Sequence, residues 1–194
     1  MTDLSPRDQA VCEAMQCWLE RAVIELNLCP FAKAVHSKGQ IHYALSAACD
    51  GETLLQDLER EISDLLLQDA QLRDTTLLIA PDAFPDFWDF NAFLRSADKL
   101  LRKKGWEGEV QIASFHPRYE FADAACGDMA HYTNRAPYPT LHLLREASLD
   151  QAVEALPDAA LIYERNIATM RALGPDGWRA LKVGGPDKSQ ERLP

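Results

Sequence analysis

The sequence predicts an α/β fold: a single compact domain in which one mixed, mostly parallel sheet of about four strands is covered by helices. Two observations support this prediction. Short apolar segments alternate with longer segments whose apolar residues recur at helical spacing. The chain has 194 residues, of which 47% are hydrophobic, so it is long enough to bury one core. We expect the domain to span residues 1–183 and the polar residues 184–194 to form a flexible tail.

Two helices are predicted at the start of the chain. A proline and an acidic residue follow Ser5, which is typical of a helix start, and apolar residues then recur at helical spacing up to Leu26. Pro30 is expected to open a second, short helix, because the missing N–H of proline costs nothing in the first turn. Cys29 is expected at or near the N-cap of this helix, and Gly39 is expected to end it.

Four apolar segments are predicted to form the strands of one sheet. They cover residues 40–47, 75–80, 109–115 and 140–146. After the first strand, residues 50–52, which begin with Asp50, are expected to form a cap and turn, and apolar residues from Leu54 to Leu66 at helical spacing predict a helix. Residues 86–104 predict another helix, which Gly105 ends. Because helices separate the first three strands, we expect these strands to be parallel.

Further helices are expected after the fourth strand. Ser148 and Gln151 have the spacing of a capping box, which predicts a helix start at this point. A last helix is expected from Pro157 to about Leu173, with Gly174 and the proline after it as the stop.

Composition argues against several classes of partner. The 20 basic and 30 acidic residues give a net charge of -10, which repels a phosphate backbone or an anionic membrane surface. The sequence has neither an apolar run of membrane-spanning length nor the charged-then-apolar order of a secretory signal, so we expect a cytoplasmic protein. Five cysteines at unrelated spacings, with no CxxC pair, argue against a disulfide framework.

The long segment 116–139 is the main candidate for function. It has mixed polarity without a regular period, and loops of this length inside compact domains are usually functional or disordered. Ligands collect at the carboxyl ends of parallel strands, which places residues 80–82 and 115–117 at the same edge. The candidate ligand-binding residues are Arg118, Tyr132, Asn134, Arg135 and His142. Their donors, positive charges and aromatic rings suit a small anionic or planar metabolite.

Cys29 and His116 are the candidate catalytic residues. A thiol at a helix N-terminus is favoured as thiolate, and Lys33 and His36 follow one and two turns on. The alternative is that Cys29 only caps a helix and fills a small apolar space. His116 follows a predicted strand and is a candidate proton carrier, although a histidine in this position often only bonds to its own loop.

Metal binding is an open alternative, although no metal site is predicted. The possible ligands are His116, Cys126, Asp128 and His131, whose spacing matches no common metal motif. The sequence also lacks the glycine-rich nucleotide loops and the GxSxG serine-hydrolase motif, so the cofactor is unknown.

Four motifs taken in order, NLCPFA, FHPRYEF, NRAPYP and HLLRE, resemble the bacterial family catalogued as domain of unknown function 1415. The resemblance covers about residues 8–175. It implies no known activity, and therefore no catalytic residue. This chain has Ala136 in NRAPYP where serine is expected, which removes a hydroxyl from that position.

Two functional hypotheses follow. The first is an enzyme or binding protein for a small anionic metabolite, with a site built from the Cys29 helix start and residues 116–139. The second is a non-catalytic module whose long loop binds a protein partner. A pocket with convergent polar groups favours the first, and a flat apolar loop surface favours the second. The sequence leaves the reaction, the substrate and the oligomeric state open.

Overall fold

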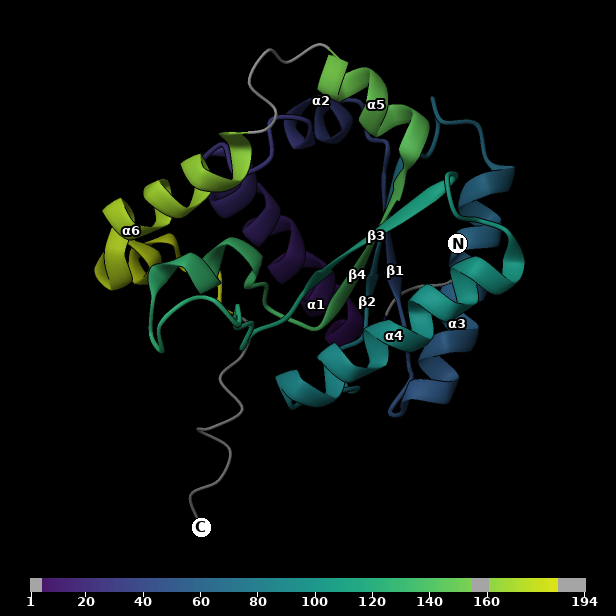
Figure 1. The fold of residues 1–194 in the computed structure, drawn as a ribbon, viewed down its shortest axis with the longest axis horizontal. Coiled ribbons are helices and arrows are strands. Elements are labelled where there is room, and N and C mark those ends of the chain that lie inside the picture. Colours follow the sequence, from purple (N-terminus) through teal and green to yellow (C-terminus); the bar gives the residue numbers. More distant parts are fainter. Residues whose placement is uncertain (1–4, 155–160, 185–194) are drawn as a thin grey trace.

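The computed structural model describes residues 5–154 and 161–184, which contain one four-stranded sheet (Figure 1). The strands are β1 (Ile41–Leu45), β2 (Thr75–Ile79), β3 (Val110–Phe115) and β4 (Thr140–Arg145). The helices before β3 are α1 (Pro6–Trp18), the π-helix η1 (Leu19–Ile24), α2 (Ala32–Ser37), α3 (Gly51–Leu67) and α4 (Phe87–Lys104). After β3 come the 3-10 helix η2 (Met129–Asn134), α5 (Glu146–Glu154) and α6 (Ile162–Leu181). The predicted α/β class is confirmed.

The strand order is β1-β2-β4-β3. The first three strands run in the same direction, as predicted, but β4 lies between β2 and β3. Only β1 and β2 therefore form a parallel pair, and β4 is antiparallel to both of its neighbours. Residues 116–139 explain this arrangement. They return the chain to β4 at the same end of the sheet at which β3 finishes, whereas a parallel neighbour needs a crossover to the opposite end.

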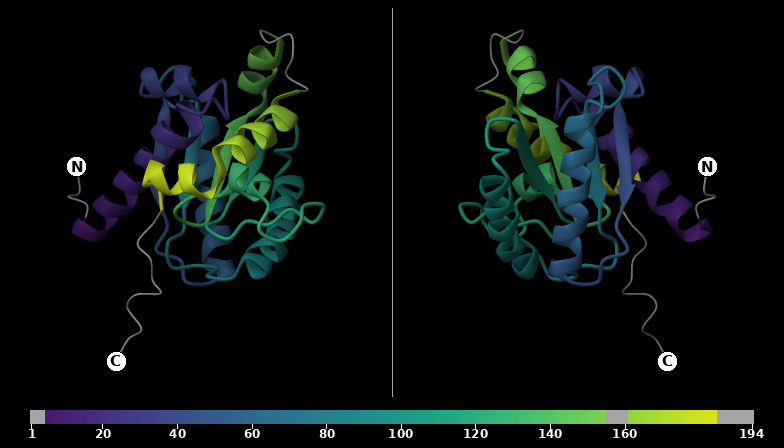
Figure 2. Two further views of the ribbon diagram at one scale, coloured as in Figure 1. Left: turned by 90° about the vertical axis from the view of Figure 1, so that its left-hand side faces the viewer. Right: turned by 90° about the vertical axis from the view of Figure 1, so that its right-hand side faces the viewer.

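Helices cover both faces of the sheet, and each face has its own apolar core (Figures 1 and 2). Leu78 of β2 points to α3 and α4, while its neighbour Leu77 points to α1 and η1. This alternation follows from the two-residue period of a strand. Figure 2 shows α3 in front of the strands in its right view and α6 in front in its left view. Every residue of β2 is therefore buried, because an apolar core covers each face of this strand.

Several predicted helix ends are confirmed. The Ser5 side chain accepts a hydrogen bond from the N–H of Asp8 at the start of α1. The Asp50 carboxylate accepts a hydrogen bond from the N–H of Thr53 at the start of α3, over 2.8 Å. Gly105 ends α4 with a φ of 71°, a left-handed conformation that glycine adopts without strain. Short polar side chains and glycine thus set these boundaries.

The start of α5 differs from the prediction. α5 begins at Glu146, directly after β4, so Ser148 lies inside the helix. The Ser148 hydroxyl is 2.5 Å from a carboxylate oxygen of Asp74, to which it donates. The capping box predicted for Ser148 and Gln151 is therefore wrong, because Asp74 from the start of β2 competes for the hydroxyl.

The end of α6 also differs. Gly174 has a non-helical backbone, with φ 65° and ψ 175°, but helix continues beyond it to Leu181. The predicted stop is thus a break within the helix: the proline after Gly174 opens a new first turn, where it needs no hydrogen bond. The predicted start at Pro157 and the tail after Gly184 lie outside the described residues.

Candidate functional site

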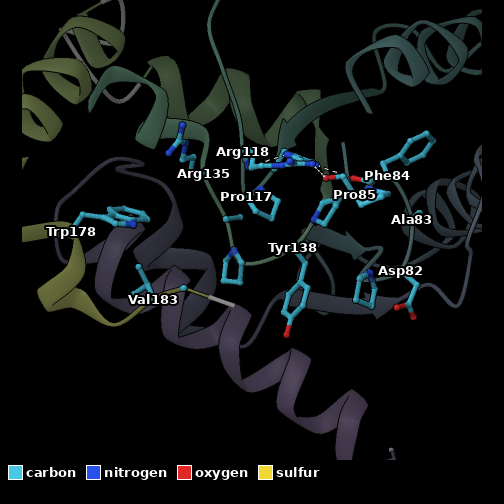
Figure 3. A pocket seen from close by; sticks show the side chains of 16 residues that line it. Asp82, Ala83, Phe84, Pro85, Pro117, Arg118, Arg135, Tyr138, Trp178 and Val183 are labelled. Carbon is cyan, nitrogen blue, oxygen red and sulfur yellow. Dashed lines mark hydrogen bonds between the residues drawn. The ribbon is translucent and has the colours of Figure 1, made fainter. Parts of the chain in front are cut away.

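An open cavity of about 570 Å³ lies at the edge of the sheet where β2 and β3 end and β4 begins (Figure 3). We call it the edge cavity. Its wall consists of residues 81–85, 116–118 and 135–139 together with Trp178, Val183 and Gly184. The first two segments follow β2 and β3, as predicted from the rule for the carboxyl ends of strands.

Five prolines form much of this wall. They are Pro81, Pro85, Pro117, Pro137 and Pro139. A proline has no backbone N–H and a fixed φ, so these positions give a stiff, apolar surface that cannot donate hydrogen bonds. Polar recognition in the edge cavity therefore depends on side chains.

Arg135 supplies a positive charge at this wall. Its Nε donates to the carbonyl of Tyr119 over 3.3 Å, and its guanidinium carbon lies 4.2 Å from the ring centre of Tyr132. The edge of Trp178 packs on the same tyrosine, with ring centres 5.1 Å apart. Arg135 forms no ion pair with any residue in the described ranges 5–154 and 161–184. The side chain is thus positioned while its charge is not neutralised.

Arg118 is a second cation on the wall, but some of its guanidinium N–H groups already bind other parts of the protein. It donates to the carbonyl of Pro85 and lies 3.7 Å from a carboxylate oxygen of Asp86. Figure 3 shows Arg118 extending toward Phe84 and Pro85 across the upper wall. Arg118 therefore links the segments that follow β2 and β3, and its charge is shared with Asp86.

His116 is buried and uses both ring nitrogens. Nδ1 accepts a hydrogen bond from the N–H of Arg118 over 3.0 Å, so the proton is on Nε2, which donates to the carbonyl of Phe84 over 3.0 Å. The ring stacks on Phe90. Burial lowers the pKa of His116 below its usual value, so the ring is neutral. These contacts support a structural role in the cavity wall, because neither nitrogen is free to move a proton.

His131 repeats this pattern inside the 116–139 segment. Its Nδ1 accepts from the N–H of Phe121 over 3.0 Å, and Nε2 donates to the carbonyl of Ala125 over 2.9 Å. Asp128 caps η2 and forms a two-point ion pair with Arg171 of α6. The Arg171 guanidinium holds the pKa of the Asp128 carboxyl at about 2. The long segment is therefore fastened by a histidine and an ion pair, neither of which belongs to the cavity.

Cys29 and His142 lie on a different cavity. This one, of about 220 Å³, is on the face of the sheet that α1 and η1 cover, and we call it the face cavity. Its lining includes Trp18, Leu19, Val23, Cys29, Ala32, Val35, Leu77, Ala113, Phe115, His142, Leu144, Leu149 and Ala152. None of residues 116–139 lines it. The structure thus separates the predicted site residues: some line the edge cavity, Cys29 and His142 line the face cavity, and Tyr132 and Asn134 line neither.

The thiol of Cys29 is not the N-cap of α2. The helix begins at Ala32 with Phe31 as its N-cap, and Cys29 lies in the turn just ahead. Cys29 is thus near the N-cap, as expected, but the helix starts later than predicted because Pro30 opens the preceding turn and not the helix. Burial raises the pKa of Cys29, although the N–H groups of Phe31 and Ala32 act in the opposite direction. The thiol is therefore kept protonated near neutral pH.

The other predicted residues are placed as follows. Tyr132 lies under the Arg135 guanidinium, and the amide of Asn134 donates to the carbonyl of Ser114 over 3.2 Å. The sequence did not reveal Trp178, because no spacing connects it with segment 116–139. The proline content of residues 81–85 and 135–139 is a signal that could have indicated a rigid wall.

Two other features, a metal-binding cluster and a membrane-spanning helix, are absent from the described residues. In the described part of the chain, no three side chains of the metal-binding types come together. None of the helices within residues 5–154 and 161–184 combines the length and apolar character needed to cross a bilayer.

No curated protein and no solved structure matches this chain. A family model does match, over residues 10–180, a range that includes the whole lining of the face cavity and that of the edge cavity except Val183 and Gly184. Its description, protein of unknown function (DUF1415), carries no activity. The chain belongs to the DUF1415 family.

Proposed function

We propose that this protein binds a small organic anion with a flat apolar body in the edge cavity, and that Arg135 is the anchor for the negative charge. The observation that carries this proposal is that Arg135 is held in position at the cavity wall while its charge has no ion-pair partner among the described residues. It lines the cavity, it is held over Tyr132, and it forms no ion pair among the described residues. A guanidinium group recognises a carboxylate best through two parallel N–H bonds.

The electrostatics of the whole chain support this assignment. With a net charge of -10, most of the surface repels an anion, so binding requires a local positive field. Arg118 lies on the same wall and adds to that field, although Asp86 partly offsets it. The wall also carries the carboxylate of Asp82, which pairs with Arg7, so the two guanidinium groups are suited to one carboxylate and not to an extended polyanion.

The apolar wall supports a flat body for the ligand. Proline rings and the aromatic rings of Tyr138 and Trp178 line the space in Figure 3 and give it apolar surface. Ligand pockets in proteins are mostly apolar with a few placed polar groups, which is the composition found here. We infer an aromatic or cyclic monocarboxylate as the class of ligand.

Binding is better supported than catalysis. The candidate proton carrier, His116, has both nitrogens bonded to backbone groups. The candidate nucleophile, Cys29, lines the face cavity and has a raised pKa. The interaction-module hypothesis is also less well supported, because segment 116–139 folds around the edge cavity and packs on α6 through η2.

Thermal stability in the presence of benzoate and of its uncharged analogue benzamide tests the proposal. A ligand that prefers the folded state raises the melting temperature. We expect benzoate to raise it and benzamide to have little effect. Arg135→Lys keeps the charge but loses the planar fork, and should weaken benzoate binding about tenfold, the effect of roughly 1.4 kcal/mol.

Arg102→Lys is the matched control, since Arg102 is an exposed residue near the end of α4 and does not line the edge cavity. It should leave the benzoate response unchanged. The proposal fails if Arg135→Lys lowers the melting temperature without ligand as much as it lowers the response to benzoate, because Arg135 would then be a structural fastener. It also fails if benzamide binds as tightly as benzoate.

A further inference from the structure

The face cavity has a mostly apolar lining that includes one hydrogen-bond acceptor without a donor among the described residues. That acceptor is Nδ1 of His142, and its protonation state follows from Thr75. The Thr75 hydroxyl lies 2.6 Å from the carbonyl of Leu143 and 2.7 Å from Nε2 of His142. A carbonyl cannot donate, so the single hydroxyl proton of Thr75 goes to Leu143, and Nε2 of His142 must carry the proton that Thr75 accepts. Nδ1 is then a lone-pair acceptor.

Nothing within the described residues donates to this Nδ1. His142 lines the face cavity, where Ala113 of β3 and Leu77 of β2 are its cross-strand neighbours. Both neighbours are apolar. Burial lowers the pKa of His142 to about 4, so the ring stays neutral at physiological pH and Nδ1 stays an acceptor. Because His142 lines the face cavity and Nδ1 has no donor among the described residues, this acceptor is available to a donor group of a ligand.

The other charged or hydroxyl side chains of the lining, Asp74, Arg145 and Ser148, are hydrogen-bonded within the protein. Ser148 donates to Asp74, and Arg145 donates to the carbonyls of Leu65, Gln68 and Arg73. Asp74 and Arg145 carry opposite charges, so the lining of the face cavity has no net charge. A carboxylate is disfavoured beside His142, because its oxygens would face the Nδ1 lone pair.

We propose that the face cavity is a second binding site, for a neutral molecule with one aromatic ring and one O–H or N–H donor, such as a phenol or an indole. The donor bonds to Nδ1 of His142, and the ring occupies the apolar space. The volume of about 220 Å³ suits one ring system, since an apolar cavity of roughly 150 Å³ can hold benzene.

Two aromatic side chains favour a ring in this space. Trp18 and Phe115 both line the cavity, and they pack edge to face with centres 5.2 Å apart. Phe115 also lies 6.2 Å from the His142 ring, centre to centre. A ligand ring can extend this set of edge-to-face contacts. The site differs from the edge cavity in charge, in lining and in the class of ligand.

Calorimetric titration of the full chain with phenol and with toluene tests this proposal. Toluene has the same shape but a methyl group in place of the hydroxyl, so it cannot donate to Nδ1. We expect phenol to bind about tenfold more tightly than toluene, and benzoate to leave the site empty. In His142→Phe the acceptor is lost, and phenol and toluene should bind equally.

Two further variants locate the site. Ala113→Leu should abolish phenol binding while keeping the ligand-free melting temperature near that of the wild type, because the larger side chain fills an existing space. Arg135→Lys should leave phenol binding unchanged, which separates this test from that of the edge cavity. Equal affinity of the wild type for phenol and toluene, no saturable binding of phenol, or phenol binding that survives Ala113→Leu would each overturn the proposal.

Discussion

The indole Nε1–H of Trp18 donates to the backbone carbonyl of Arg135 over 2.9 Å. This single bond connects α1 with the segment that carries the proposed anion anchor. The Trp18 ring also lines the face cavity and packs against Phe115, while Arg135 lines the edge cavity. The Trp18 side chain therefore lines the face cavity and also holds the backbone of Arg135 in the wall of the edge cavity.

Trp18→Phe is expected to lower stability and to weaken benzoate binding. Phenylalanine keeps an apolar ring but leaves the carbonyl of Arg135 without its donor, at a cost of about 1–2 kcal/mol. Trp106→Phe is a suitable control, because Trp106 packs on the α3 and α4 side of the sheet and its indole makes no hydrogen bond within the described residues. Urea unfolding and benzoate titration of both variants measure the two effects. A benzoate affinity unchanged in Trp18→Phe would contradict the role of this bond.

The sequence predicted the elements of the fold better than their arrangement. Residue periodicity indicated all four strands, and capping residues such as Asp50 and Gly105 set helix ends correctly because these effects are local. The position of β4 between β2 and β3 depends on the path of segment 116–139, which has no local signal. Ser148 shows the same limit, because a distant carboxylate, that of Asp74, determines what its hydroxyl binds.

The candidate site was predicted in part. The rule that ligands bind at the carboxyl ends of parallel strands correctly predicted that residues 80–82 and 115–117 lie at the same edge of the sheet. It did not reveal that His116 is fully bonded to backbone groups, since its partner Phe84 lies in another loop. Cys29 was expected beside segment 116–139. It instead lines the face cavity, together with Trp18 and Phe115. Motif order along a chain does not predict which motifs share a cavity.

His142 is expected to make the protein less stable in acid. Its pKa is about 4 in the folded protein against 6.5 in the unfolded chain, so the unfolded state binds more protons between these values. The contribution of His142 to stability is complete above pH 6.5 and is lost progressively as the pH falls toward 4, by roughly 2–3 kcal/mol. Urea unfolding as a function of pH measures the slope.

The matched variant for this measurement is His142→Phe, which cannot titrate. Its stability should change less than that of the wild type between pH 6.5 and 4. The Asp128 carboxyl, whose pKa is about 2, contributes stability that is lost only as the pH falls below about 3.8, so its effect falls in a lower pH window. Parallel pH profiles of the wild type and His142→Phe above pH 4 would contradict the buried, neutral state of His142.

Gly174→Ala is expected to weaken ligand binding in the edge cavity as well as stability. The φ of 65° with ψ 175° is a conformation that only glycine adopts readily, so alanine strains the break in α6 that precedes Trp178. Gly108→Ala is the control, because Gly108 also has a positive φ and open space around an added Cβ, but lies in the turn before β3. Both variants should lose about 1 kcal/mol or more. Only Gly174→Ala should reduce the affinity for benzoate, because only that break positions Trp178.

The thiol of Cys29 is expected to react slowly. Alkylating reagents attack the thiolate, and burial raises the pKa of Cys29, so less thiolate is present and less of the sulfur is accessible. Cys49 and Cys126 are exposed and serve as internal references in the same sample. At pH 7.5, iodoacetamide should modify Cys29 on the order of tenfold more slowly than either reference, as followed by peptide mass spectrometry over time.

The same measurement with phenol present connects the thiol with the face cavity. Because Cys29 lines that cavity, a bound phenol should slow its alkylation further, while the rates at Cys49 and Cys126 stay constant. Ala113→Leu should remove this protection, since it occupies the space that the ring would fill. A Cys29 that reacts faster than the exposed cysteines would instead restore the hypothesis of an activated thiol. The turn that carries Cys29 would then favour the thiolate through the N–H groups of Phe31 and Ala32 more strongly than burial opposes it.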